Sequence, residues 1–88
     1  MKHELKMWPE SFNPLWSGDK TFELREDDLG FKVDDLLKLK EWSEEGRKSG
    51  GYTGREITAT VMFVMSGLGL EKDWVAMSLS HFFLKPKD

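Results

Sequence analysis

The chain contains no cysteine in its 88 residues. Disulfides, thiolate zinc sites and cysteine nucleophiles are therefore excluded. Histidine is nearly as scarce, and His3 and His81 have no metal-type spacing between them. Acidic residues cluster at 26–28 and 34–35, but such clusters are typical of solvated turns. We therefore expect neither a metal nor another cofactor.

Long apolar runs are also missing. The longest lies at residues 61–65 and is far shorter than the ~20 residues that a membrane-spanning helix needs. The first residues are charged and no apolar stretch follows them, so we expect no signal peptide. The sequence predicts a cytoplasmic protein without a membrane partner.

A surplus of basic residues is absent as well. Lys and Arg number 13 against 16 Asp and Glu, which gives a net charge of −3. Proteins that neutralise many phosphates carry a basic surplus, so tight, extended wrapping of nucleic acid is disfavoured, whereas a pocket for one nucleotide is not. The hydrophobic content of 39% is enough for one packed core, and we interpret residues 1–88 as a single domain.

Alternating apolar and polar residues predict strands at 3–7, 20–25, 36–42, 55–65 and 74–80. Pro9 begins a short helix that runs to about residue 17, Pro14 is expected to leave it broken or very short, and Gly18 ends it. Residues 43–54 are rich in Gly, Ser and charge and predict a loop. Phe82 and Phe83 either close the core or pair at an edge. One barrel core is expected from the following inward-facing residues: Leu5, Leu24, Leu37, Ile57, Val61, Phe63 and Val75.

These elements predict an α+β, mainly β fold. Five to six short strands with one short helix after the first strand favour a small closed or nearly closed β-barrel, because closure removes unpaired strand edges. We expect at least two of the four tryptophans, at positions 8, 16, 42 and 74, to lie in its core.

The segment at residues 18–25 is the most informative part of the chain. Its residues Gly18, Lys20, Glu23 and Arg25 fit the pattern G-x-K-x-x-E-x-R. Glu23 and Arg25 share one face of the predicted strand, and Phe22 and the following leucine share the other. Exposed ion pairs over an apolar inner face would explain this alternation without any function.

The pattern resembles the signature of the ASCH domain, a PUA-like family associated with RNA. Residues 3–6, Phe12 and residues 50–55 are similar to a small ASCH-like family of bacteria and phages that has no assigned function, and the likeness covers residues 3–79. The resemblance implies a PUA-like barrel with a ligand cleft beside the helix. Lys20 and Arg25 would hold a phosphate or a carbonyl oxygen there, and Glu23 would accept from a base amine.

Three further residues are candidate ligand contacts. His3 would reach the same cleft, or it is a structural hydrogen-bonding residue. Tyr52 would stack on a base and Arg55 would bind a phosphate; alternatively Arg55 pairs with an acid, and Gly51 and Gly54 only shape a hairpin loop.

The main functional prediction is an RNA- or nucleotide-binding module. One enzyme branch of the resembled fold hydrolyses the amide of an acylated cytosine nucleoside with a lysine and, three residues later, a threonine. Lys20 matches that lysine, but Glu23 stands at the threonine position and Thr21 faces elsewhere. Lys20 and Glu23 are therefore the catalytic candidates if the chain is an amide hydrolase. A third interpretation is a protein-interaction accessory, related to phage or defence functions.

Overall fold

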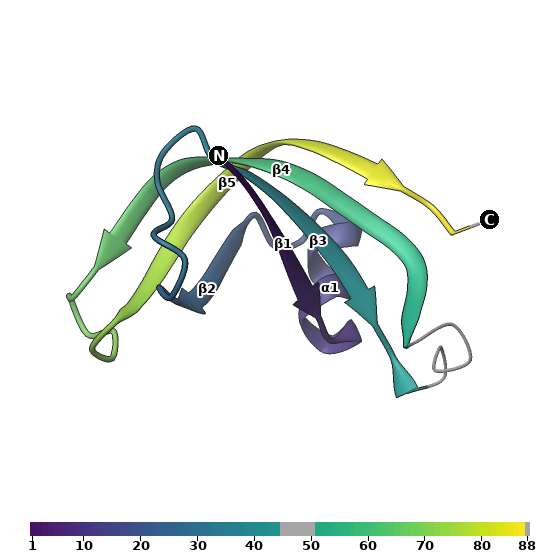
Figure 1. Cartoon of the computed structure of the whole chain (residues 1–88), viewed down its shortest axis with the longest axis horizontal. Helices are drawn as coiled ribbons and strands as arrows, with labels where there is room; N and C mark the ends of the chain where they lie inside the picture. Colours follow the sequence, from purple (N-terminus) through teal and green to yellow (C-terminus); the bar gives the residue numbers. More distant parts are fainter. Residues whose placement is uncertain (45–50, 88) are drawn as a thin grey trace.

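The computed structural model describes residues 1–44 and 51–87. It contains five strands and one helix in the order β1 (Lys2–Met7), α1 (Pro9–Ser17), β2 (Phe22–Glu26), β3 (Leu36–Trp42), β4 (Tyr52–Ser66) and β5 (Trp74–Lys85). All five strands belong to one sheet with the order β1-β3-β4-β5-β2. The sheet curls around α1 as a half-barrel (Figure 1). The fold is thus mainly β with one short helix after the first strand, as predicted.

The half-barrel leaves one seam. β1 pairs with β3 in parallel, and the other pairings are antiparallel. β1 and β2 therefore form the two edges of the sheet and run in opposite directions across the seam. α1 connects β1 to β2 along the chain. These two strands are therefore close in sequence, although they are furthest apart in the sheet order.

The core fills the concave side of the sheet. Buried side chains come from every second position of β1, β3, β4 and β5, and α1 adds Phe12 and Leu15. Five of the predicted core residues are buried there: Leu5, Leu37, Ile57, Val61 and Val75. The alternation of residues 36–42 and of 55–61 therefore identified the inner face of the central strands correctly.

The prediction is wrong for two core residues, Phe63 and Leu24. Phe63 is 61% exposed because the pairing of β4 with β5 shifts between Val61 and Phe63. One extra residue at such a bulge moves every later side chain to the opposite face, and Val64 packs against the core in its place. Leu24 is 45% exposed, while its neighbour Glu23 is buried. The inner face of β2 is the ionic one, opposite to the simple structural interpretation.

Helix α1 is continuous over residues 9–17 with Pro14 inside it, so the predicted break is wrong. Burial of Phe12 and Leu15 stabilises the helix despite the hydrogen bond that a proline removes. Gly18 ends the helix as predicted: its φ is 88°, and its N–H donates to the Leu15 carbonyl.

The predicted loop at 43–54 is too long. β4 already begins at Tyr52, which pairs with Trp42. Residues 45–50 of the predicted loop lie outside the described residues. β5 is longer than predicted and continues to Lys85 through a second shift of register.

The tryptophans are less buried than expected. Trp8 is 48% exposed, and Trp16, Trp42 and Trp74 are half-buried. Among the described residues, no helix is long and apolar enough to span a membrane.

Candidate functional site

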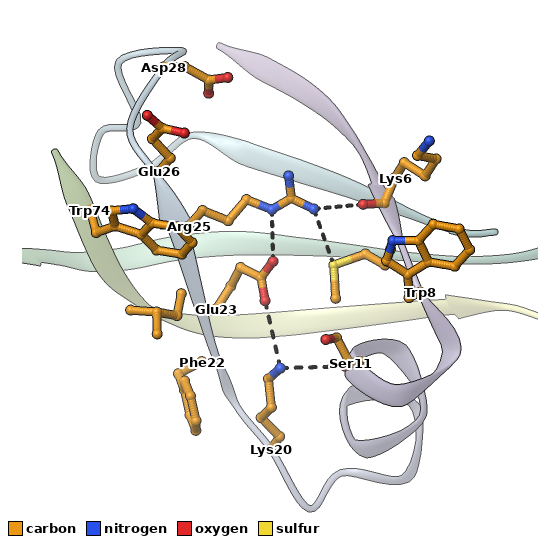
Figure 2. A pocket seen from close by; sticks show the side chains of 12 residues that line it. Lys6, Trp8, Ser11, Lys20, Phe22, Glu23, Arg25, Glu26, Asp28 and Trp74 are labelled. Atoms are coloured by element: carbon orange, nitrogen blue, oxygen red, sulfur yellow. Dashed lines mark hydrogen bonds and ion pairs between the residues drawn. The ribbon is translucent and has the colours of Figure 1, made fainter. Parts of the chain in front are cut away.

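A cavity of about 550 Å³ lies at the seam of the half-barrel. Its lining comes from the end of β1, the start of α1 and the whole of β2 (Figure 2). This volume falls within the usual range of small-molecule sites, roughly 300–1,000 Å³. We call it the seam cavity, and it is lined by Lys6, Met7, Trp8, Ser11, Lys20, Phe22, Glu23, Leu24, Arg25, Glu26, Asp28 and Trp74.

Glu23 is the centre of the polar lining. The Arg25 Nε atom donates to Glu23 Oε2 at 2.8 Å, and the Lys20 Nζ atom lies 3.7 Å from Glu23 Oε1. Only 6% of the Glu23 side chain is exposed. A carboxylate so far removed from water needs charged partners. The structure thus brings together the three residues singled out by the sequence pattern; whether they bind a ligand stays a prediction.

Arg25 crosses the seam. Its second nitrogen, Nη2, donates to the Lys6 carbonyl of β1 at 2.7 Å and lies 3.6 Å from the Met7 sulfur. One guanidinium therefore joins a carboxylate of β2 to the main chain of β1. Its planar, forked donors suit such a fixed geometry, so the structure gives Arg25 a positioning role.

Lys20 is held much more loosely. Its Nζ atom is 3.7 Å from Glu23 and 3.5 Å from the Ser11 carbonyl, both at the long limit for such contacts. The ammonium also lies 5.4 Å from the centre of the Phe22 ring. A lysine with long contacts at the rim of a cavity can turn toward an incoming oxygen at little cost.

The formal charges of the seam cavity cancel. Its lining holds the cations Lys6, Lys20 and Arg25 and the anions Glu23, Glu26 and Asp28. A lining of this kind does not suit a polyphosphate or a long phosphate backbone. It suits a ligand that is neutral or carries little charge, such as a nucleoside or one nucleotide.

Aromatic and hydroxyl groups complete the lining, and the sequence interpretation missed their place there. Trp8 precedes α1, and its half-exposed indole lies on the β1 side of the seam (Figure 2). Trp74 lines the opposite side, and the Ser11 hydroxyl belongs to the first turn of α1. Trp8 directly precedes Pro9, the first residue of α1. This order in the sequence could have placed the Trp8 ring beside the first turn of the helix.

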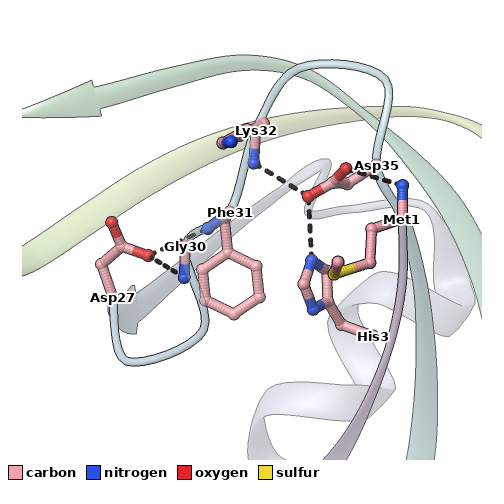
Figure 3. A network of polar contacts seen from close by, with 7 residues as sticks. All are labelled: Met1, His3, Asp27, Gly30, Phe31, Lys32 and Asp35. Atoms are coloured by element: carbon pink, nitrogen blue, oxygen red, sulfur yellow. Dashed lines mark hydrogen bonds and ion pairs between the residues drawn. The ribbon is translucent and has the colours of Figure 1, made fainter.

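His3 is not among the described residues that line the seam cavity. It is buried in a separate network, where its Nε2 atom lies 2.8 Å from Asp35 Oδ2 (Figure 3). The amino group of Met1 and the N–H of Lys32 donate to the same carboxylate, each at 3.0 Å. The hydrogen bond from His3, followed by that from the terminal amine, lowers the pKa of Asp35 to about 2. The alternative that His3 is structural therefore fits its position.

Arg55 also lies away from the seam cavity and pairs with a buried acid. Its Nε and Nη2 atoms donate to the two oxygens of Glu41 at 2.9 and 2.8 Å, and Nη2 also donates to Asn13 of α1. The guanidinium lies 5.1 Å from the centre of the Phe12 ring and 4.8 Å from that of Trp16. Arg55 lowers the pKa of Glu41, and Glu41 raises that of Arg55. This pair ties α1 to the sheet.

Tyr52 belongs to a third cluster. Its ring meets Trp42 edge to face at 4.9 Å, and the Lys40 ammonium lies 4.5 Å from its centre. The Lys6 ammonium lies 4.7 Å from the centre of the Trp42 ring, and Gly51 packs so closely on this ring that a Cβ there would be only 2.2 Å from an indole atom.

An apolar row lies on the outer face of β2, β5 and β4. Phe22 and Phe63, both more than half exposed, are each paired with Ser78 of the strand between them. Leu24 stands in the next register position beside Ala76. Under the protein-interaction interpretation, this row is the surface that a partner would contact.

The described part of the chain has no cluster of three His, Asp or Glu side chains arranged to hold a metal.

Residues 2–79 match the family described as Domain of unknown function (DUF3850). The chain belongs to this family. No curated protein matches the sequence. The family match carries no link to ASCH domains, so that resemblance stays a prediction.

Proposed function

We propose that the chain binds a nucleotide, free or within RNA, in the seam cavity. The observation that carries the proposal is the buried Glu23 carboxylate at the wall of an otherwise open cavity. Burying an ionised group and its partners is costly, and replacing them with apolar residues is often neutral or stabilising. A charged group retained at this place is therefore better explained by a ligand than by stability.

The geometry divides the roles. Arg25 is fixed by short contacts to Glu23 and to the β1 main chain, whereas Lys20 has only long contacts. We assign the direct contact with a ligand oxygen to Lys20, because a flexible ammonium can follow different oxygen positions. Glu23 orients Lys20 and would accept from an exocyclic amine. The resemblance to ASCH domains of the PUA-like superfamily supports RNA as the source of the nucleotide.

The test is binding of the four nucleoside 5′-monophosphates, measured by calorimetry on the wild type and on Lys20→Ala. The matched control is Lys32→Ala, an exposed lysine outside the seam cavity. We expect Lys20→Ala to weaken binding by at least about tenfold, since a charge-assisted hydrogen bond contributes ~1.5–3 kcal/mol. Thermal stability should change little, because the contacts of Lys20 are long and Glu23 keeps its short ion pair with Arg25.

Salt dependence gives a second readout on a single-stranded oligonucleotide. One or two phosphate contacts correspond to a slope of log K against log salt of about −1, because each contact contributes roughly −0.7. A slope that corresponds to six or more released counterions would contradict a single-nucleotide site. Wild-type protein that binds none of the monophosphates at millimolar concentration would refute the proposal.

The amide hydrolase remains a prediction without a supporting observation. Both Glu23 oxygens already face cations, and the hydroxyl side chain in the lining is Ser11 of α1 rather than a residue at the expected threonine position. Incubating the protein with an acylated cytidine and separating the products by chromatography tests it directly. Release of cytidine that is lost in Glu23→Gln would establish the enzyme.

A further inference from the structure

The register of β2 on β5 determines where the main chain of β2 points. At one end of the strand the Leu79 N–H donates to the Thr21 carbonyl, and at the other the Asp27 N–H donates to the Asp73 carbonyl. In an antiparallel pair, hydrogen-bonded residues alternate with residues whose N–H and C=O point away. Odd-numbered residues of this strand therefore bond to β5. The peptide groups of Phe22, Leu24 and Glu26 point toward the seam.

Part of this free edge has no protein partner. The Glu26 carbonyl accepts from the Asp28 N–H at 3.0 Å. Within the part of the chain that the structure describes, the N–H and C=O groups of Phe22 and Leu24 have no hydrogen-bond partner. All three of these β2 residues line the seam cavity. Phe22 and Leu24 thus contribute two donors and two acceptors of the main chain to the cavity wall.

The length of the free edge argues against an added peptide strand. Two residues of open edge span only about 7 Å, and strands usually have five or six residues. Arg25 also crosses the seam beside this edge to reach the Lys6 carbonyl. The opening therefore fits a short planar group better than an extended polypeptide.

We propose that the Leu24 N–H and C=O bind the Watson–Crick edge of a nucleobase in the seam cavity. This inference rests on the proposed function and adds the means of recognition. In an extended residue the N–H and C=O point to the same side, as an adjacent donor and acceptor. Each nucleobase carries an adjacent donor and acceptor on that edge, and bases outside a duplex are read there. Leu24 lies between Glu23 and Arg25, so the base would sit beside the ionic centre, with Trp8 on the facing wall.

The first experiment follows amide signals by NMR while the wild type is titrated with uridine 5′-monophosphate and cytidine 5′-monophosphate. We expect the Leu24 amide to shift on titration. Ribose 5-phosphate, which lacks a base, should leave it unmoved. Methylation of the base at N3 blocks the edge, so 3-methyluridine 5′-monophosphate should bind at least about tenfold more weakly than uridine 5′-monophosphate.

The second experiment removes the donor itself. Leu24→Pro eliminates the N–H, and proline is tolerated on an edge strand where the N–H faces outward. Leu24→Ala is the matched control because it keeps the N–H and shortens only the outward side chain. We expect Leu24→Pro to weaken binding of uridine 5′-monophosphate by about tenfold and Leu24→Ala by less than about threefold.

The outcomes separate this inference from the proposed function. If nucleotides bind and depend on Lys20, but the Leu24 amide is silent and N3 methylation has no effect, the inference is overturned and the proposed function stands. If no nucleotide binds, both are overturned. The amide and methylation results need only the wild type, so they decide the matter even if Leu24→Pro fails to fold.

Discussion

Replacing Arg55 with methionine should destabilise the protein by about 3 kcal/mol and leave nucleotide binding unchanged. The sequence left two roles open for Arg55, a phosphate contact or pairing with an acid, and the structure pairs it with Glu41 and places it outside the seam cavity. If Arg55 is structural, the substitution lowers stability and leaves binding unchanged. If Arg55 contacts the ligand, the substitution lowers binding and leaves stability unchanged. Methionine keeps much of the length and the apolar contact of the arginine stem, so the variant mainly removes the charge.

The magnitude follows from the burial of the partner. The Glu41 side chain is 5% exposed and loses two donors of Arg55, while the Thr53 hydroxyl remains at 2.7 Å. Removing one member of a buried ion pair usually costs 3–5 kcal/mol, because the other charge is left without compensation. The guanidinium is itself 21% exposed, and one donor remains, so the lower end of that range, about 3 kcal/mol, is expected. This figure includes roughly 0.5–1 kcal/mol from the lost cation–π contacts.

Urea unfolding followed by tryptophan fluorescence measures this cost. A domain of this length has a free energy of unfolding of about 4–13 kcal/mol, so the variant should still fold at low temperature. Lys38→Met is the matched control, since Lys38 pairs with Glu56 at 3.4 Å and both side chains are more exposed than Glu41. We expect it to cost at most about 1 kcal/mol.

A double-mutant cycle with Glu41→Gln isolates the pair, and a coupling energy of about 2 kcal/mol is expected for contacting, buried partners. The reasoning is refuted if Arg55→Met costs no more than the Lys38→Met control. It is also refuted if Arg55→Met folds with wild-type stability and loses nucleotide binding, because Arg55 would then be a ligand contact.

Four more substitutions test the fold. Gly51→Ala should destabilise by at least about 2 kcal/mol in the same urea assay, because φ is 94° and a Cβ would lie 2.2 Å from an indole atom; wild-type stability would contradict the packing. Phe63→Ser should cost less than about 0.5 kcal/mol and Val61→Ala about 2 kcal/mol, and the reverse order would mean that the bulge is misplaced. Asp35 has its pKa lowered from 3.8 to about 2, so its contribution is complete above about pH 4 and is lost as the pH falls toward 2. The melting temperature of Asp35→Asn should therefore lie below that of the wild type at pH 6, and the gap should close between about pH 4 and 2.

The central strands could be predicted from sequence because their alternation is continuous. Ile57 and Val61 keep a period of two and lie inside. The alternation cannot reveal the bulge after Val61, since Phe63 continues the same apolar pattern in the sequence. Register depends on the partner strand, where the pairing moves from Leu79 to Ser78 while β4 advances by two residues. Such a shift becomes visible only once both strands are aligned in space.

The orientation of β2 illustrates a second limit. A period of two separates Glu23 and Arg25 from Phe22 and Leu24, but it does not say which pair faces inward. Phe22 and Leu24 were predicted to face inward because they are the more hydrophobic pair. Pairing with β5 places Glu23 opposite Met77, which is fully buried, so Glu23 must point to the concave side.

The candidate site was predicted where its residues are close in sequence and missed where they are not. Lys20, Glu23 and Arg25 lie within one turn and strand, so local geometry alone brings them together. His3 and Arg55 were also predicted to be ligand contacts, with structural roles as the alternatives. Their partners, Asp35 and Glu41, are 32 and 14 residues away along the chain, and no local pattern announces pairs at such separations.

The position of the seam explains why this small fold has a polar cavity at all. Direct pairing of β1 with β2 would close the barrel and satisfy both edges, but α1 occupies the connection between them. Arg25 bridges the seam at one point by donating to the Lys6 carbonyl, and the buried Glu23 carboxylate is its counter-ion. The remaining main-chain groups of Phe22 and Leu24 are left to water or to a ligand. A ligand that meets them and also offers an oxygen to Lys20 would complete the edge that the chain leaves open, so under the proposed function the ionic centre and the free edge would act as one binding surface.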